Sequence, residues 1–295
     1  MDKTSVADLQ PKTYRTLAIE YSDDISCGLS TKGDKNLQPG IDKVMERYQH
    51  YFSVNGLALN QNKSSLIVFR YGDASCTLKV NNIKEKKFLK FLGVIFDSDY
   101  SFQRHYNSVK KTVNWKVSKL NPICRYLTPK TRQEVISALC YGSLMYCYQI
   151  WGRLPNIRNQ AQKTQNVINR AMVQKKMSRG EMLSKLSYLK MENWYLFLLV
   201  TDLWKYLKSG SCPFTQSLLD WRTRLYYTRR QSMLLNYRHK VLHGSLSFIF
   251  ASVSAWNKIN IPGVMQEVKS KSFEDMKIKV KGTLTDLFDN FNIPP

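Results

Sequence analysis

The chain has 295 residues, of which 43% are apolar, and its 45 Lys and Arg against 22 Asp and Glu give a formal charge of +23. This apolar fraction argues against wholesale disorder. The longest apolar run, residues 194–200, is far shorter than the roughly 18 residues of a membrane helix. The first residues contain no apolar h-region and no small-residue cleavage site, and the six cysteines form no CxxC motif. We therefore expect an intracellular protein, nuclear or cytoplasmic, with no membrane partner.

The excess positive charge is unevenly distributed. Residues 1–75 carry 9 basic and 9 acidic side chains, whereas residues 76–135 carry 13 against 4. Residues 153–190 carry 9 against 1, and residues 205–240 carry 8 against 1. This pattern predicts a neutral N-terminal unit followed by a basic region that faces a polyanion, most commonly nucleic acid. The alternative is a soluble Lys-rich surface, but the interleaved Arg and aromatic residues favour nucleic acid.

The first hundred residues predict a mixed α and β unit. Two β-prone runs, residues 17–21 and 25–29, are separated by polar turn-formers and predict a hairpin with Asp23 and Asp24 at its tip. Apolar residues then recur at three- and four-residue steps from Ile41 to Phe52, which indicates an amphipathic helix that ends at Asn55-Gly56. Strands are predicted over residues 65–71, 76–80 and 88–96.

Beyond residue 100 the sequence predicts helices. One is expected over residues 103–125, and Thr128 with Pro129 supplies a cap and a first-turn proline for a long helix toward Trp151. Pro155 and Gly180 separate further helices, and residues 194–207 predict a buried one. The fold class is α+β, with a small mixed unit followed by a mostly helical, basic region.

The Asp23-Asp24 pair has two interpretations. Adjacent carboxylates on a rigid hairpin can bind Mg²⁺, which prefers oxygen ligands and shares them with substrate phosphates. An Asp pair in a turn is also ordinary turn chemistry, and by itself the pair does not decide between the two.

Several motifs in chain order resemble one polymerase family. Tyr21-Ser-Asp-Asp24 resembles the Tyr/Phe-x-Asp-Asp hairpin of reverse transcriptases. Residues 51–69 are similar to the Asn-Gly-Leu-x-Leu-Asn-x-x-Lys segment of non-LTR (LINE-type) retrotransposon polymerases. Residues 88–97 resemble their Phe-Leu-Gly primer-grip strand, and residues 100–105 the opening of their thumb. The similarity continues through residues 141–152 and 165–170 to Ala255-Trp-Asn257, and so covers nearly all the chain.

The resemblance implies the C-terminal part of a LINE-type reverse transcriptase, an RNA-directed DNA polymerase that uses an RNA template, a DNA primer and two metal ions. Residues 1–100 would be a partial palm, residues 101–215 a helical thumb-like region, and residues 216–295 a basic C-terminal tail domain.

The resemblance also implies site residues. Asp23 would bind Mg²⁺ or Mn²⁺ with Asp24 as its partner, and Lys63 would protonate the pyrophosphate or act by charge alone. An ordinary exposed lysine is the alternative for Lys63. The primer grip would be formed by Phe91, Leu92 and Gly93, with Phe91 also a candidate core residue and Gly93 allowing close backbone approach. The phosphate contacts would come from Arg104, Lys110, Lys111 and Lys116.

One expected element of the family has no counterpart in the sequence. Two-metal polymerases need another Asp on a neighbouring palm strand, contributed in this family by a motif well upstream of the hairpin, and only 20 residues precede Tyr21. The fingers are also lacking, so we expect the chain alone to be inactive. Two alternatives follow: a non-catalytic nucleic-acid-binding protein derived from such a fragment, or a subunit whose partner chain supplies the missing palm.

Overall fold

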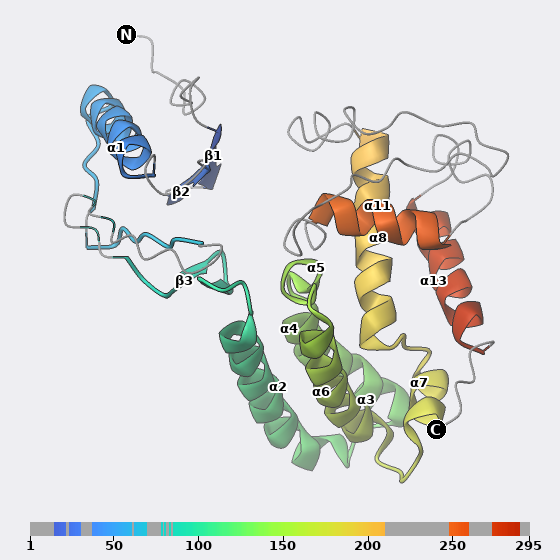
Figure 1. Ribbon diagram of the computed structural model, residues 1–295. Coiled ribbons are helices and arrows are strands. Elements are labelled where there is room, and N and C mark those ends of the chain that lie inside the picture. The colour runs from blue at the N-terminus through green and yellow to red at the C-terminus, as the bar shows by residue number, and fades with distance from the viewer. Residues whose placement is uncertain are drawn as a thin grey trace, which may run out of the picture. The chain divides into compact units, whose positions relative to one another are not determined.

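The computed structural model describes residues 15–21, 24–30, 37–60, 62–69, 78, 80, 83, 85–209, 248–259 and 273–289 (Figure 1). The chain divides into two compact units, Met1–Ser101 and Phe102–Pro295. The first unit mixes short strands with one long helix, and the regular elements described in the second are all helices, so the α+β prediction is confirmed. The palm, thumb and tail assignments stay predictions.

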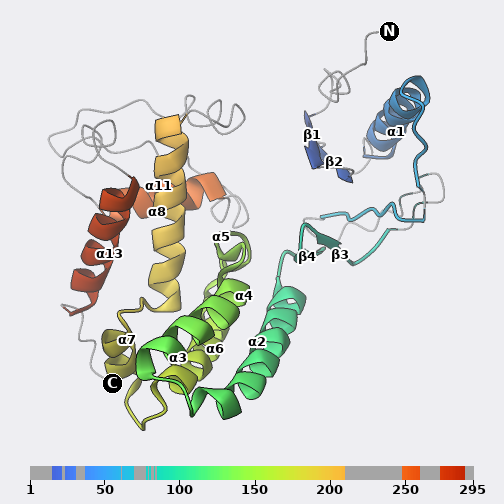
Figure 2. The same ribbon diagram turned by 180° about the vertical axis from the view of Figure 1, so that it is seen from behind.

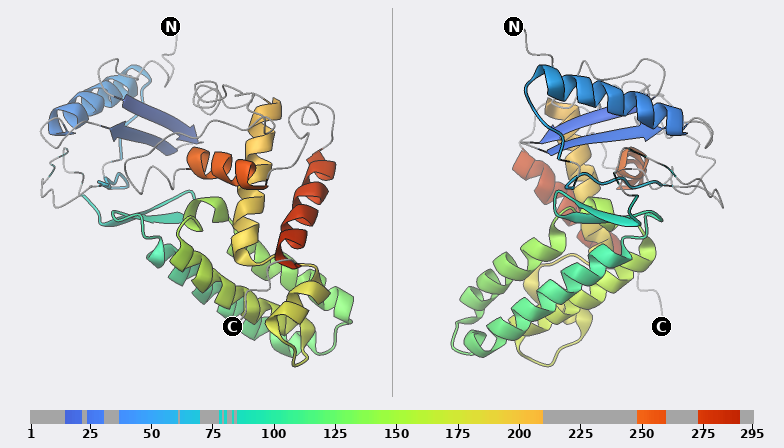
Figure 3. Two further views of the ribbon diagram at one scale, coloured as in Figure 1. Left: turned by 45° about the vertical axis from the view of Figure 1, so that its right-hand side comes forward. Right: turned by 90° about the vertical axis from the view of Figure 1, so that its left-hand side faces the viewer.

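The first unit begins with the hairpin that the sequence predicts. Strand β1 (Arg15–Tyr21) pairs antiparallel with β2 (Asp24–Ser30), from Arg15 opposite Ser30 to Tyr21 opposite Asp24. The pairing leaves a two-residue connection, residues 22 and 23, which lies outside the described part. Helix α1 (Leu37–Val54) packs against β2 (Figure 3).

The amphipathic helix predicted from residue 41 is confirmed as α1. It buries Ile41, Val44 and Tyr48 on one face because these residues recur at three- and four-residue steps. Ile41 shares a buried cluster with Val68, Leu78 and Val80. The helix ends at Asn55-Gly56, where Asn55 Nδ2 donates to the Tyr51 carbonyl at 2.8 Å and Gly56 has φ +67°.

The single strand predicted over residues 88–96 is wrong. The segment forms a hairpin in which β3 (Phe88–Phe91) pairs with β4 (Val94–Asp97) around Leu92 and Gly93. Both central residues have positive φ, 44° and 85°, as a tight two-residue turn requires. Leucine rarely adopts positive φ, so the apolar sequence of residues 88–96 predicted one continuous strand and gave no signal of a turn. In residues 65–69 the structure shows an isolated bridge from Leu66 to Glu85 rather than the predicted strand.

The second unit is a helical assembly in which α2, α3 and α6 lie side by side (Figures 1 and 2). None of its described helices combines the length and apolarity that a bilayer crossing requires. Its described helices are α2 (Gln103–Cys124), α3 (Pro129–Ile136), the π-helical turn η3 (Ser137–Tyr141), α4 (Gly142–Met145), α5 (Tyr148–Trp151), α6 (Pro155–Val173), α7 (Arg179–Leu186), α8 (Met191–Ser209), α11 (Phe248–Ile259) and α13 (Phe273–Asp289).

The long helix predicted from Pro129 to Trp151 begins as expected, with the Thr128 hydroxyl accepting from Thr131 N–H at 3.3 Å. It does not continue unbroken, however. It passes through the π-helical turn and is interrupted at Cys147, which has φ +51°. The interruption lets Trp151 enter the core, where its indole N–H donates to the Tyr146 carbonyl at 2.8 Å and its ring lies 4.7 Å from that of Tyr148.

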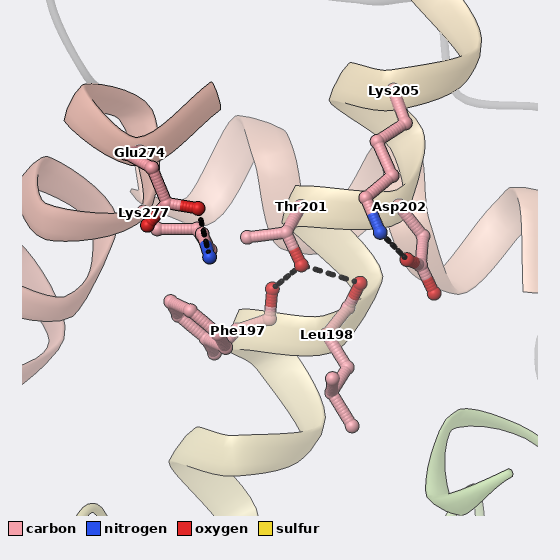
Figure 4. A network of polar contacts seen from close by, with 7 residues as sticks. All are labelled: Phe197, Leu198, Thr201, Asp202, Lys205, Glu274 and Lys277. Atoms are coloured by element: carbon pink, nitrogen blue, oxygen red, sulfur yellow. Dashed lines mark hydrogen bonds and ion pairs between the residues drawn. The ribbon is translucent and has the colours of Figure 1, made fainter. Parts of the chain in front are cut away.

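Helix α8 confirms the buried helix predicted over residues 194–207, and it packs against α13 (Figure 4). Phe273 at the start of α13 stacks on Trp204 with ring centroids 5.4 Å apart. The ammonium groups of Lys205 and Lys277 lie 4.6 and 4.8 Å from the same ring. This cation–π contact joins the two helices through a single aromatic side chain.

Candidate nucleic-acid interface

The acidic pair lies at the β1–β2 connection. Asp24, which the sequence predicts at the hairpin tip together with Asp23, is the first residue of β2 and pairs with Tyr21. Asp23 and the side chain of Asp24 lie outside the described residues, so their metal site stays a prediction. Within the described part, no three His, Cys, Asp or Glu side chains gather closely enough to bind a metal ion.

Lys63 lies in a turn organised by Asn60. The Asn60 side-chain oxygen accepts from the Lys63 N–H at 3.2 Å, and the Asn60 carbonyl accepts from the Ser64 hydroxyl at 2.9 Å. An Asx-type turn of this kind accounts for the Asn-x-x-Lys spacing. The Lys63 side chain is exposed, which suits either of its two interpretations.

The predicted primer-grip residues meet at the tip of the β3–β4 hairpin. Leu92 and Gly93 form the turn, and Phe91, half-buried, pairs with Val94. Sequence reasoning missed Asp97 at the other end of this hairpin. Its buried carboxylate accepts from the Ser101 N–H at 2.6 Å and the Ser101 hydroxyl at 3.0 Å, and so fixes the chain where β4 ends.

The four predicted phosphate-binding residues all lie on α2, but not on one face. At about 100° per residue, Arg104 and Lys111 point away from the buried stripe that contains Val109 and Val113. Lys110 is exposed on the side that faces α6. Lys116 lies about 120° around the helix from Lys110, and its ammonium donates to Ser143 Oγ at 2.7 Å and to the Leu139 carbonyl at 3.0 Å.

Helix α6 carries cations that the sequence analysis did not assign to a site. Together α2 and α6 contain eight Lys and Arg residues, five on the first and three on the second, and no Asp or Glu. Arg158 is engaged internally, donating to the Gly152 and Arg153 carbonyls at 3.1 and 2.8 Å. Lys163 and Arg170 are exposed. The charge count over residues 153–190 was the available signal for this second basic helix.

Two buried tyrosines of the helical unit, Tyr141 and Tyr148, have raised pKa values. Burial raises the pKa of Tyr141 well above its ordinary value, and the Tyr141 hydroxyl donates to Asn169 Oδ1 on α6 at 2.8 Å. Burial raises the pKa of Tyr148 likewise. Tyrosine is protonated at physiological pH even at its ordinary pKa of about 10, so these increases affect stability only at alkaline pH.

Comparison with known proteins finds similarity to one kind of enzyme. Over 142 residues the chain is 20% identical to the RNA-directed DNA polymerase from mobile element jockey of Drosophila funebris, and 20% identical to that of Drosophila melanogaster. Each match covers 46% of this chain and 16% of the relative. No protein-family model matches the chain, and no solved structure matches it significantly. The similarity supports a relationship to the reverse transcriptases of LINE-type retrotransposons.

Proposed function

We propose that the chain is the part of a LINE-type RNA-directed DNA polymerase that comprises the end of the palm, the thumb and the C-terminal tail. Its helical unit binds the RNA template and the DNA primer. The observation that carries this proposal is the pair of neighbouring helices α2 and α6, which hold eight basic and no acidic residues in a chain similar to the jockey polymerases.

The physical argument concerns phosphate charge. A surface that neutralises phosphates releases condensed counterions, which drives binding at low salt and makes it sequence-independent. Arg104, Lys110 and Lys111 are exposed on α2 and would supply these contacts. The Lys116 ammonium is hydrogen-bonded to η3 and α4. Such contacts position a nucleic acid without reading its bases.

The proposed catalytic role rests on the Tyr-x-Asp-Asp hairpin. Asp23 and Asp24 offer adjacent carboxylate oxygens, the donor set that Mg²⁺ or Mn²⁺ prefers. The metal ions would activate the primer hydroxyl and stabilise the pyrophosphate. Lys63 would add positive charge at the leaving group. Extension also requires a strand-borne Asp from the rest of the palm, whether joined to this chain or supplied by another.

A second candidate is a nucleic-acid-binding protein without catalysis. This candidate is favoured because the basic helices α2 and α6 belong to the helical unit, whereas the acidic pair belongs to the first unit. Binding by these helices therefore does not need the acidic pair. In this case binding is independent of Mg²⁺ and of both carboxylates.

Fluorescence anisotropy of the full chain with an RNA–DNA primer–template tests the proposal. We expect strongly salt-dependent binding, and Arg104→Gln/Lys110→Gln/Lys111→Gln should lower the slope of log K against log salt by roughly 2 to 3. The matched control is Lys130→Gln/Arg179→Gln/Lys185→Gln, which removes equal charge from exposed positions of α3 and α7. Absence of binding, or equal slopes for both variants, would contradict the proposal.

Primer extension separates the two candidates. With a complementary palm segment present, the polymerase proposal predicts RNA-templated extension that Asp23→Asn abolishes while binding is retained. Extension that survives Asp23→Asn would contradict the catalytic assignment. Binding that persists unchanged in Asp23→Asn/Asp24→Asn, with no extension under any of these conditions, would favour the second candidate.

A further inference from the structure

Helices α2 and α6 run parallel, which brings their C-terminal ends together. Near their starts, Gln103 and Gln160 exchange amide hydrogen bonds of 3.0 Å, and the Tyr106 hydroxyl lies 2.8 Å from the Gln160 carbonyl. One turn further along α6, the same hydroxyl lies 3.0 Å from Thr164 Oγ1. Figure 3 shows the two helices side by side.

Between their C-terminal halves lies a groove of about 510 Å³, which we call the α2–α6 groove. Buried Val117 and Ala171 form part of its base. Its rim is polar and exposed, and is formed by Asn121, Arg125, Arg170 and Gln174. Arg125, at the C-cap of α2, and Arg170, in the last turn of α6, therefore line the same groove.

The groove has a net positive charge even when the negative ends of the two helix dipoles are included. Arg170 lies in the last turn of α6 and Arg125 at the C-cap of α2, where cations stabilise the helix dipole. Each helix end carries roughly −0.5 elementary charge, so two guanidinium groups leave a net charge of about +1. Neither helix contains an acidic residue, and no ion pair neutralises either arginine among the described residues.

Tyr126, the residue after Arg125 in the chain, does not line the groove itself but carries an exposed aromatic ring. Tyr126 is 90% exposed, and in the part of the chain that the structure describes its ring contacts no other aromatic side chain. Exposed rings beside a cationic groove are typical of sites where bases stack while the backbone follows the positive charge. A duplex does not present base faces for such stacking, so this composition favours a single strand.

We propose that the α2–α6 groove binds a single-stranded segment of nucleic acid, with backbone phosphates at Arg125 and Arg170 and a base on Tyr126. This inference rests on the proposed function, because it assumes that the helical unit binds nucleic acid. It adds a site on the inner side of α2, distinct from the outward Arg104 and Lys111, and it commits that site to unpaired nucleotides.

The test uses the full chain and a labelled single-stranded oligouridylate, with a duplex of equal length for comparison. Arg125→Gln/Arg170→Gln should lower the single-strand slope of log K against log salt by about 1.4, and Tyr126→Ala should weaken binding roughly 5- to 150-fold. Tyr126→Phe should retain the affinity because its ring is kept. The matched control for charge is Arg179→Gln/Lys185→Gln on α7, which contributes no residue to the groove.

The outcomes separate this inference from the function on which it rests. If the wild-type chain binds neither oligonucleotide, the proposed function fails. If the wild type binds but the groove variant matches the α7 control, or if only duplex binding is weakened, the groove assignment alone is overturned. Equal loss for Tyr126→Ala and Tyr126→Phe would overturn the stacking contact.

Discussion

The Lys116 ammonium lies 2.7 Å from the Ser143 hydroxyl and also donates to the Leu139 carbonyl, so it joins α2 to η3 and α4. Two of its three hydrogens are thus used within the protein. Its neighbours Lys110 and Lys111 are exposed. Lysines that are close in the sequence of α2 therefore have different roles: Lys116 holds helices together, whereas Lys110 and Lys111 are exposed to solvent.

Replacing Lys116 by Met should lower the free energy of unfolding by about 1 kcal/mol, because both hydrogen bonds are lost while the aliphatic stem remains. Lys111→Met is the matched control and should stay within about 0.5 kcal/mol of wild type. Urea unfolding followed by far-UV circular dichroism measures both. Equal effects of the two substitutions would contradict a structural role for Lys116.

Gly152 is needed because no side chain fits there. A Cβ atom would lie 2.6 Å from Tyr148 Cε2 and 2.7 Å from the Tyr148 carbonyl, and the Tyr148 ring is fully buried. Gly152→Ala should cost about 1–3 kcal/mol of stability through overpacking. Gly180→Ala, where a Cβ meets nothing within 4 Å, should instead stabilise by about 0.4–1 kcal/mol. Thermal unfolding compares the two, and a neutral Gly152→Ala would refute the steric argument.

The hydrogen bond from Tyr141 to Asn169 is fully buried. Tyr141→Phe leaves the amide oxygen without this donor and should cost about 1–3 kcal/mol at neutral pH. Conversely, Tyr188→Phe removes a hydroxyl from a half-buried site, where it bonds the Ser137 hydroxyl at 3.0 Å, and should cost less. A smaller loss for Tyr141→Phe than for Tyr188→Phe would contradict the ranking by burial.

Burial of Tyr141 also leads us to predict that the stability of the protein falls at alkaline pH. Burial raises the pKa of Tyr141 above the value of about 10 found in an unfolded chain, so the unfolded state loses its proton first as the pH rises. The stability contribution is complete below about pH 10 and falls above it by up to 1.4 kcal/mol per pH unit. Tyr141→Phe should remove the contribution of Tyr141 to the fall of the unfolding free energy with pH. Identical alkaline slopes for the variant and wild type, measured by urea midpoints, would contradict the assignment.

Local patterns in the sequence were sufficient for the elements that depend on short-range chemistry. The β1–β2 hairpin, the apolar face of α1 and the Thr128 cap follow from strand propensity, helical spacing and capping preference. The turn at Leu92–Gly93 and the helix break at Cys147 could not be predicted in this way. At both places a non-glycine residue, Leu92 or Cys147, adopts positive φ to satisfy packing beyond the local sequence.

The candidate site also has features that the sequence predicts and features that depend on tertiary packing. The run of cations on α2 was visible in the sequence, but the tie of Lys116 to Ser143 depends on how η3 and α4 fold back along α2. Arg125 and Arg170 are far apart in sequence and share the groove only because α2 and α6 pack in parallel. Helix periodicity does not encode this pairing.

Photocrosslinking of the full chain to single-stranded RNA that contains thiouridine, with peptide mass spectrometry, is the most direct test of nucleic-acid binding by the helical unit. We predict crosslinked peptides from residues 103–126 and 155–174, including exposed Trp115 and Tyr126, that excess unlabelled RNA suppresses. Crosslinks confined to residues 15–97, or unaffected by the competitor, would contradict the central claim.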